Sequence, residues 1–439
     1  MKLSLPDLVS DPVNRVISKG GIAVELCRQA VALVANLSTH FGKGVINLIC
    51  DRKLEAPDVW QLMHYVDTDT DFTGISKEGM EALDALKIPP IFYEMLQGIR
   101  AIRSMPKHEG VVGGICDKIN RRLDPVERKE EERQPRIYVA GEGSSIAIPG
   151  ALATKFSRDI DNAVVVSRCC SDITDICACD TVIILSNSGM TDTAVRLAER
   201  ANGVGALTFG ITKDSGSELA RVCGKENTII LNCGTESAVG ATKSVVEQCF
   251  VVSEIIRRLS SVGYVESNYD ELAEIFSTAL TQEVPQEIIR RIAFARQLVI
   301  IGNHGVHREA ALKAAETIGL KVRLIDSSFA LHGDEETFGD GDVVLFIEPD
   351  LEKLPKIGRH IASRVPVFYL RNDIGVADEF SIPVPKHEEY QPVMNLGVVQ
   401  NLLIRLAIYK GCSCEPQHCR KVGDAVELQN SGGDGGMAA

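Results

Sequence analysis

A serine-rich turn near the middle of the chain has the residue types that hold a phosphate. It lies in TVIILSNSGMTDTAVRLAER, where an apolar run is followed by Ser186, Asn187, Ser188, Gly189 and Thr191. If the residues after the turn form a helix, its N-terminus offers free amides and partial positive charge, Gly189 permits close approach, and the hydroxyls add donors. The turn therefore predicts a phosphate site that needs no Lys or Arg. The plainer alternative is a capped helix start that binds nothing.

A glycine turn in VAGEGSSIAI precedes the serine turn in the chain. Its Ser145 is expected near the same sheet edge, within reach of the same ligand. Both turns follow apolar runs, and ligands of open α/β sheets bind beyond the carboxyl ends of the strands. The stretch GEGSS lacks the third glycine of the dinucleotide fingerprint, so it is weak evidence for a dinucleotide.

Alternating β-branched runs and amphipathic segments predict the elements that position these turns. The first set of strands is expected at 136–141, 162–168, 181–187, 206–212 and 228–233, with a helix over 238–262. The second set is expected at 298–303, 321–326, 342–349, 365–371 and 380–385, with a helix over 393–409. The spacing repeats, and each set opens with a strand, a glycine turn and a helix. The second set has Asp350 and no serine turn at the equivalent place, so a phosphate would be repelled there.

The sequence thus predicts an α/β protein with two tandem, doubly wound parallel sheets. The expected divisions are a helical N-terminal region over 1–130, a phosphate-binding domain over 131–268, a second domain over 269–426 with the catalytic residues, and a disordered tail over 427–439. A net charge of -13 argues against a nucleic-acid partner. No apolar run is long enough to cross a membrane and none resembles a signal peptide, so we expect a cytoplasmic protein without a membrane partner.

The two halves resemble sugar isomerase (SIS) domains. The stretches LSNSGMTDTAVRLAE and GTESAVGATKSVVEQ are similar to the first SIS domain in the isomerase half of glucosamine-6-phosphate synthase and related phosphosugar isomerases and deaminases. The stretch REAALKAAETIGLKVRLIDSSFALHGDEE is similar to the second. The resemblance covers roughly residues 135 to 425 and implies flavodoxin-like domains.

The resemblance also implies roles for particular residues. Substrate and phosphate contacts would come from Ser145, Ser186, Asn187, Ser188, Thr191 and the backbone of Val239. The proton-transferring glutamate would be Glu316, with Lys313 one turn earlier, the ring-opening histidine would be His332, and the C-terminal lysine would be Lys421. Met190, Ala241 and Asp334 depart from the synthase pattern, which leaves the exact sugar open.

Interconverting a ketose and an aldose moves a proton between C1 and C2, which requires a carboxylate shuttle such as Glu316. His332 suits ring opening near neutral pH, and Lys421 could stabilise the open-chain oxygens or form an imine. Each residue has a plainer alternative: Glu316 as an ion pair with Lys313 or Arg308, His332 as a turn cap, Lys421 as a solvated tail residue.

The expected function is therefore a phosphosugar isomerase or amino-sugar-phosphate deaminase acting on a hexose 6-phosphate or amino-hexose 6-phosphate, such as fructose 6-phosphate or glucosamine 6-phosphate. It needs no cofactor, because the proton shuttle is internal. No glutaminase domain is recognisable, which favours deamination or isomerisation over synthesis. The resemblance implies a homodimer in which His332 completes the partner's site. The alternative is a non-catalytic regulatory protein that binds a sugar phosphate.

Thirteen cysteines are expected to be reduced and to serve mainly in packing. Two groups of them lie close in sequence: Cys169, Cys170, Cys177 and Cys179, and Cys412, Cys414, His418 and Cys419. Neither group has the paired CxxC spacing of a structural zinc site, so we predict no metal.

Overall fold

The structure is a computed structural model that describes residues 90–124, 133–348, 358–373 and 380–410, except 235, 237, 261, 262, 331 and 359, and in addition 412, 419–422 and 425–428. The chain divides into two compact units, Met1–Gln97 and Gly98–Ala439, and both sheets lie in the second unit. Predictions for residues 1–89 and 429–439 fall outside the described residues. None of the helices in the described ranges combines the length and apolar character needed to cross a bilayer.

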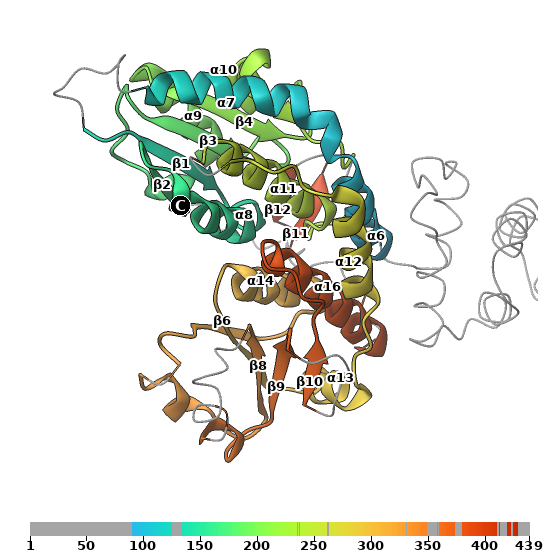
Figure 1. The fold of residues 1–439 in the computed structure, drawn as a ribbon. Helices are drawn as coiled ribbons and strands as arrows, with labels where there is room; N and C mark the ends of the chain where they lie inside the picture. Colours follow the sequence, from blue (N-terminus) through green and yellow to red (C-terminus); the bar gives the residue numbers. More distant parts are fainter. Residues whose placement is uncertain are drawn as a thin grey trace, which may run out of the picture. The chain divides into compact units, whose positions relative to one another are not determined.

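The first sheet contains five parallel strands in the order β2-β1-β3-β4-β5 (Figure 1). Its strands are β1 (Arg136–Gly141), β2 (Val164–Cys169), β3 (Thr181–Leu185), β4 (Leu207–Thr212) and β5 (Thr228–Ile230). Its helices are α8 (Ser144–Phe156), α9 (Asp192–Gly203), α10 (Glu218–Cys223) and α11 (Lys243–Arg258). All five residues of β3 are buried, as expected for a strand with helices on both faces of its sheet.

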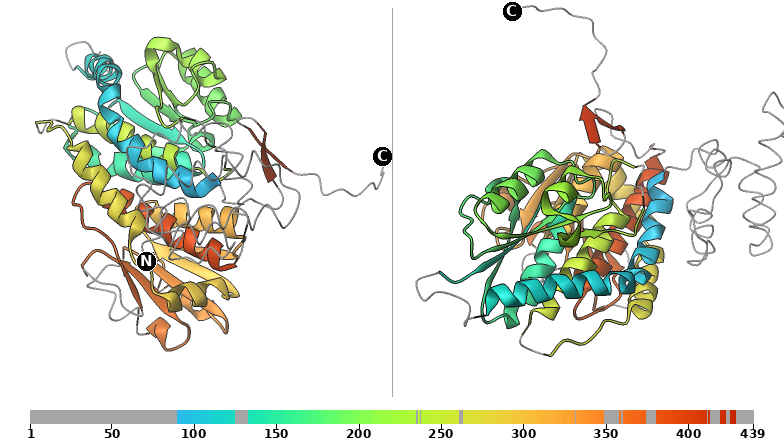
Figure 2. Two further views of the ribbon diagram at one scale, coloured as in Figure 1. Left: turned by 90° about the vertical axis from the view of Figure 1, so that its right-hand side faces the viewer. Right: turned by 90° about the horizontal axis from the view of Figure 1, so that it is seen from above.

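The second sheet repeats this topology with the order β10-β9-β8-β6-β7, again parallel throughout. Its strands are β6 (Gln297–Gly302), β7 (Val322–Asp326), β8 (Asp342–Ile347), β9 (Val367–Arg371) and β10 (Ser381–Pro383). Helices α14 (Val306–Ile318) and α16 (Gln391–Lys410) pack side by side (Figure 1, Figure 2). The prediction of two tandem, doubly wound sheets is confirmed.

The remaining elements are helical connections and a small hairpin. Helices α6 (Pro90–Arg103) and α7 (Glu109–Leu123) precede the first sheet, and α12 (Tyr269–Thr281) and α13 (Gln286–Ala293) link the two sheets and pack against α16. Strands β11 (Cys419–Val422) and β12 (Ala425–Leu428) form an antiparallel pair. Thus β12 extends two residues into the segment expected to be a tail.

One predicted helix is shorter than expected. The sequence predicts a helix over 238–262, but α11 begins only at Lys243 and ends at Arg258. The reason lies in the carboxylate of Glu236, which accepts hydrogen bonds from the Thr242 and Ser244 amides at 2.8 and 3.1 Å. These bonds hold the residues before α11 in a loop around a buried acid.

The two α/β domains meet through helices α8 and α14. Gly305, immediately before α14, has φ +80°, and a Cβ atom there would lie 1.8 Å from the carbonyl oxygen of Ala147. Only glycine permits this approach. The start of α14 therefore lies directly against the backbone of the first helix of the neighbouring domain.

Candidate functional site

The two predicted ligand turns begin side by side in the first sheet. Parallel pairing sets Gly141, the last residue of β1, opposite Leu185, the last residue of β3. The strand order reverses between these two strands, which is where open α/β sheets bind ligands. A Cβ atom on Gly141 would lie 3.1 Å from the Leu185 carbonyl oxygen and 3.1 Å from that of Ser145. The two turns therefore start at the same edge of the sheet, and a ligand site between them stays a prediction.

The serine turn is a tight loop held by its own hydroxyls. Buried Ser186 accepts a hydrogen bond from the Gly189 amide at 3.1 Å, and its Oγ lies 3.0 Å from Thr191 Oγ1. Ser188 accepts one from the Met190 amide at 3.2 Å. Gly189 has φ +64°. These hydroxyls and amides are clustered at the start of α9, where an anion is favoured by the helix dipole.

The loop that carries Val239 is tied to this turn by Glu236, which sequence reasoning missed. Glu236 is buried and accepts hydrogen bonds from Asn187 Nδ2 at 2.9 Å and from the Ser244 hydroxyl at 2.5 Å, besides those from the start of α11. One carboxylate thus joins the serine turn, the Val239 loop and α11. Its position in GTESAVG, within one of the stretches that carry the resemblance, is the signal that the sequence offers.

Three charged residues on one face of α14 form a buried cluster. Lys313 Nζ lies 2.7 Å from Glu316 Oε2 and 3.6 Å from Glu309 Oε1. The exposed fractions of the side chains are 3% for Lys313, 0% for Glu309 and 26% for Glu316. The ion pair between Lys313 and Glu316 is therefore present, but it is largely shielded from water and not a surface pair. Glu309, one turn before Lys313, was not predicted, although its i, i+4 spacing places it on the same face.

Electrostatics link this cluster to the first domain. Burial opposes protonation of Lys313, but the carboxylates of Glu309, Glu316 and Glu236 outweigh it, so the pKa of Lys313 is raised. Burial raises the pKa of Glu309, although Lys313 opposes the rise. A charged lysine thus lies between the second domain's acids and the acid that anchors the serine turn. Such a grouping is typical of sites that move protons.

His332 has no contact with this cluster among the described residues. His332 is exposed in the turn after β7, its amide donates to the Phe329 carbonyl at 2.9 Å, and its ring lies edge-on to the Phe329 ring. Lys421 lies in β11, opposite Val426. Among the predicted site residues, the structure therefore pairs Glu316 with Lys313 and leaves His332 at the surface.

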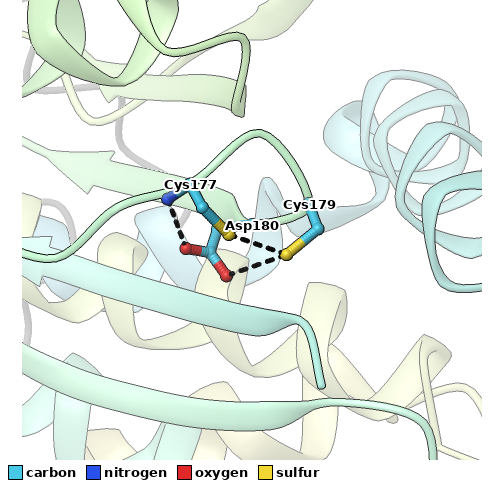
Figure 3. A group of neighbouring side chains, drawn as sticks. All are labelled: Cys177, Cys179 and Asp180. Atoms are coloured by element: carbon cyan, nitrogen blue, oxygen red, sulfur yellow. Dashed lines mark hydrogen bonds between the residues drawn. The ribbon is translucent and has the colours of Figure 1, made fainter. Parts of the chain in front are cut away.

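Cys177 and Cys179 lie close together beside Asp180 (Figure 3). Their sulfur atoms are 2.7 Å apart, and all three side chains are within reach of a single ion. However, the Asp180 carboxylate already accepts from the Cys177 and Arg136 amides, both at 2.9 Å, and pairs with Arg133. Burial raises the pKa of the Cys179 thiol to about 12, which disfavours the thiolate that a metal requires. This cluster therefore fits an anchor for the strand ends better than a metal site.

The other cysteine group lies mostly outside the described residues. Cys412 is half-buried, Cys419 begins β11, and residues 413–418 between them are not described.

Comparisons with known proteins show a related fold. Residues 132–257 match the model of the SIS domain. No curated protein has significant sequence similarity to the chain. Among solved structures, a Silicibacter pomeroyi protein provisionally assigned as a phosphosugar isomerase is 20% identical, with a TM-score of 0.61, over 75% of this chain and 100% of its own.

Two further structures show the same fold. Tagatose-6-phosphate ketose/aldose isomerase from Escherichia coli is 19% identical, with a TM-score of 0.56, over 73% of this chain and 93% of its own. The C-terminal domain of glucosamine-fructose-6-phosphate aminotransferase from Francisella tularensis is 16% identical, with a TM-score of 0.54, over 73% of this chain and 98% of its own. The chain therefore contains an SIS domain at residues 132–257 and has the tandem α/β fold of these structures.

Proposed function

We propose that the chain is a phosphosugar isomerase or amino-sugar-phosphate deaminase that moves a proton between C1 and C2 of a hexose 6-phosphate or amino-hexose 6-phosphate. The substrate would be of the fructose 6-phosphate or glucosamine 6-phosphate type. The observation that carries the proposal is the buried cluster of Glu309, Lys313 and Glu316, whose lysine interacts with Glu236 of the serine-turn network.

In this mechanism the phosphate binds at the serine turn. Ser188 and Thr191, both half-buried, face the helix start and supply hydroxyls, and the amides at the start of α9 supply the remaining donors. The sugar then extends toward α14. Ser145, Asn187 and the Val239 backbone line its path.

Glu316 takes the proton from one carbon and returns it to the next. Lys313, 2.7 Å away, remains charged and stabilises the negative charge that develops on the sugar oxygen. Glu309 holds Lys313 in place from the opposite side. His332 opens the sugar ring and Lys421 contacts the open-chain oxygens, both in a homodimer in which the partner's His332 completes the site.

The substitution Glu316→Gln tests the proton shuttle. We expect a loss of about 10²-fold or more in turnover, because the amide cannot accept the proton. The matched control is Glu287→Gln, an exposed glutamate of α13 that pairs with Arg290. Turnover of hexose and aminohexose phosphates and the exchange of C1 and C2 protons with D2O would be followed by NMR. Unchanged turnover in Glu316→Gln would show that the enzyme proposal is wrong.

A mixed dimer tests the role of His332. Coexpression of Glu316→Gln and His332→Ala chains gives heterodimers in which one site has an intact glutamate and an intact partner histidine. We expect activity to return in these heterodimers and to be low in either parent. No recovery would contradict the shared site.

The alternative is a regulatory protein that binds a sugar phosphate without converting it. It is favoured by the ion pair of Glu316 with Lys313, which engages the carboxylate of the proposed shuttle. A thermal-shift screen followed by NMR separates the two: a regulator would be stabilised by a sugar phosphate that shows no C1 or C2 exchange.

A further inference from the structure

A cavity lies at the carboxyl edge of the second sheet. Its volume is about 600 Å³, large enough for a sugar-sized molecule. His304 follows β6 and Glu348 follows β8, and both line the cavity. Parallel pairing sets Gly302 of β6 opposite Ile347 of β8, so the cavity opens where the strand order of this sheet reverses. This is the position in the second domain that the serine turn occupies in the first.

The backbone of this cavity has an unusual conformation. Among the described residues, the non-glycine residues with positive φ are His304, at 56°, and Glu348, at 52°. This conformation is unfavourable for residues with a Cβ atom and concentrates at functional sites. Both residues line the same cavity, which is not expected of a space that only separates two domains.

The charge of the cavity comes mainly from the neighbouring domain. Lys155 and Arg158, near the end of α8, and Arg371, at the end of β9, line it together with Asp373. Arg371 donates to Asp373 at 2.8 Å, so Lys155 of α8 and Arg158, just after α8, determine the sign of the site. The N-terminus of α16 also lines the cavity, with Gln391 and Pro392, and adds partial positive charge.

Glu348 offers an unused hydrogen-bonding atom within this setting. Its Oε1 accepts from Asn395 Nδ2, whereas its buried Oε2 has no hydrogen-bond partner among the described residues. Burial raises the pKa of Glu348 to about 7, although Asn395 and Lys155 oppose the rise. Burial also lowers the pKa of His304. Both groups can therefore be neutral near pH 7. Burial lowers the pKa of Lys155 too, and its Nζ donates to the Glu389 carbonyl oxygen at 2.7 Å, so Arg158 is the main positive charge.

We propose that this cavity is a second ligand site, for a small hydroxylated organic anion. Its phosphate or carboxylate group meets Lys155 and Arg158, and its hydroxyl groups meet Glu348 Oε2 and Asn395. The sequence predicted that Asp350 would repel a phosphate from this edge. Asp350 is outside the described residues. The cations come instead from the end of α8 and the turn after it in the other domain, which the spacing within the second domain does not show.

Titration calorimetry on the full chain tests the site with glucose 6-phosphate, glucuronate and inorganic phosphate. The variants are Arg158→Gln, an exposed position whose loss leaves the fold intact, and Arg290→Gln as a matched exposed arginine. We expect a hydroxylated anion to bind the wild type and Arg290→Gln equally, and Arg158→Gln at least tenfold more weakly. Comparing glucose 6-phosphate with glucuronate shows whether the site prefers a phosphate or a carboxylate group.

The variant Ser188→Ala separates this site from the serine turn, since it should leave the binding that depends on Arg158 unchanged. Three results would overturn the proposal: no probe binds the wild type, Arg158→Gln binds as tightly as the wild type, or inorganic phosphate alone binds. Loss of the Arg158-dependent binding in Ser188→Ala would also overturn it, because both effects would then belong to one site.

Discussion

The substitution Glu348→Gln should change how the stability of the protein depends on pH. Burial raises the pKa of Glu348 from 4.5 to about 7. Since each pKa unit corresponds to about 1.4 kcal/mol, ionisation of this group opposes folding by up to about 3 kcal/mol. Between these two values the fold keeps a proton that the unfolded chain has released. The contribution of Glu348 to the unfolding free energy is therefore most favourable below about pH 4, and it declines as the pH rises toward 7.

Glutamine at position 348 preserves the shape of the side chain and cannot titrate. Its amide oxygen can accept the hydrogen bond of Asn395, while its NH2 group takes the position of the buried Oε2. We therefore expect the wild type to lose about 2–3 kcal/mol of unfolding free energy more than Glu348→Gln between about pH 5 and about pH 8. Lys155, His304 and Asp373 also face the cavity, and their contributions largely cancel when the two proteins are compared.

Urea unfolding followed by circular dichroism at both pH values would measure the difference. Glu287→Gln is the control, because its hydrogen bonds to Arg290 and Arg291 lower the pKa of Glu287 to about 2, below the range tested. That variant should follow the wild type. If Glu348→Gln had the same pH dependence as the wild type, the carboxyl would not be held neutral by burial and the reasoning would fail.

Two further substitutions probe the first-domain site. Gly189→Ala would place a Cβ atom 2.2 Å from Ser217 Oγ at a φ of +64°. We expect thermal unfolding to show a loss of about 1–3 kcal/mol in stability, together with weaker sugar-phosphate binding. An unchanged melting temperature would contradict this expectation. Lys313→Met would leave the buried Glu309 carboxylate without its cation, so we expect a loss of about 3–5 kcal/mol in urea unfolding. Adding Glu309→Gln to Lys313→Met should restore stability but not activity. A Lys313→Met variant as stable as the wild type would refute this expectation.

The sequence predicted the two sheets well because their signals are local. Each buried strand is a short apolar run, such as the five residues of β3, and each run is followed by a turn and an amphipathic helix. Such patterns fix the order of the elements and, through the rule that ligands bind at the carboxyl edge, the position of the serine turn.

The parts that were missed depend on contacts between distant segments. Glu236 reads as an ordinary loop acid, and only the fold shows that it accepts hydrogen bonds from the serine turn and from α11. Lys155 reads as a solvated residue at the end of a helix, yet α8 directs it toward the second domain. No periodicity within one segment contains this information, because it arises where two independently patterned domains meet.

The meeting of Gly305 with Ala147 limits how the two domains can move. Main chain touches main chain there, so no side chain can rotate or shorten to give room. Parting the two halves requires displacement of entire helices. The single methyl group of Gly305→Ala would consequently push the two α/β domains apart, so this substitution is a minimal way to separate them.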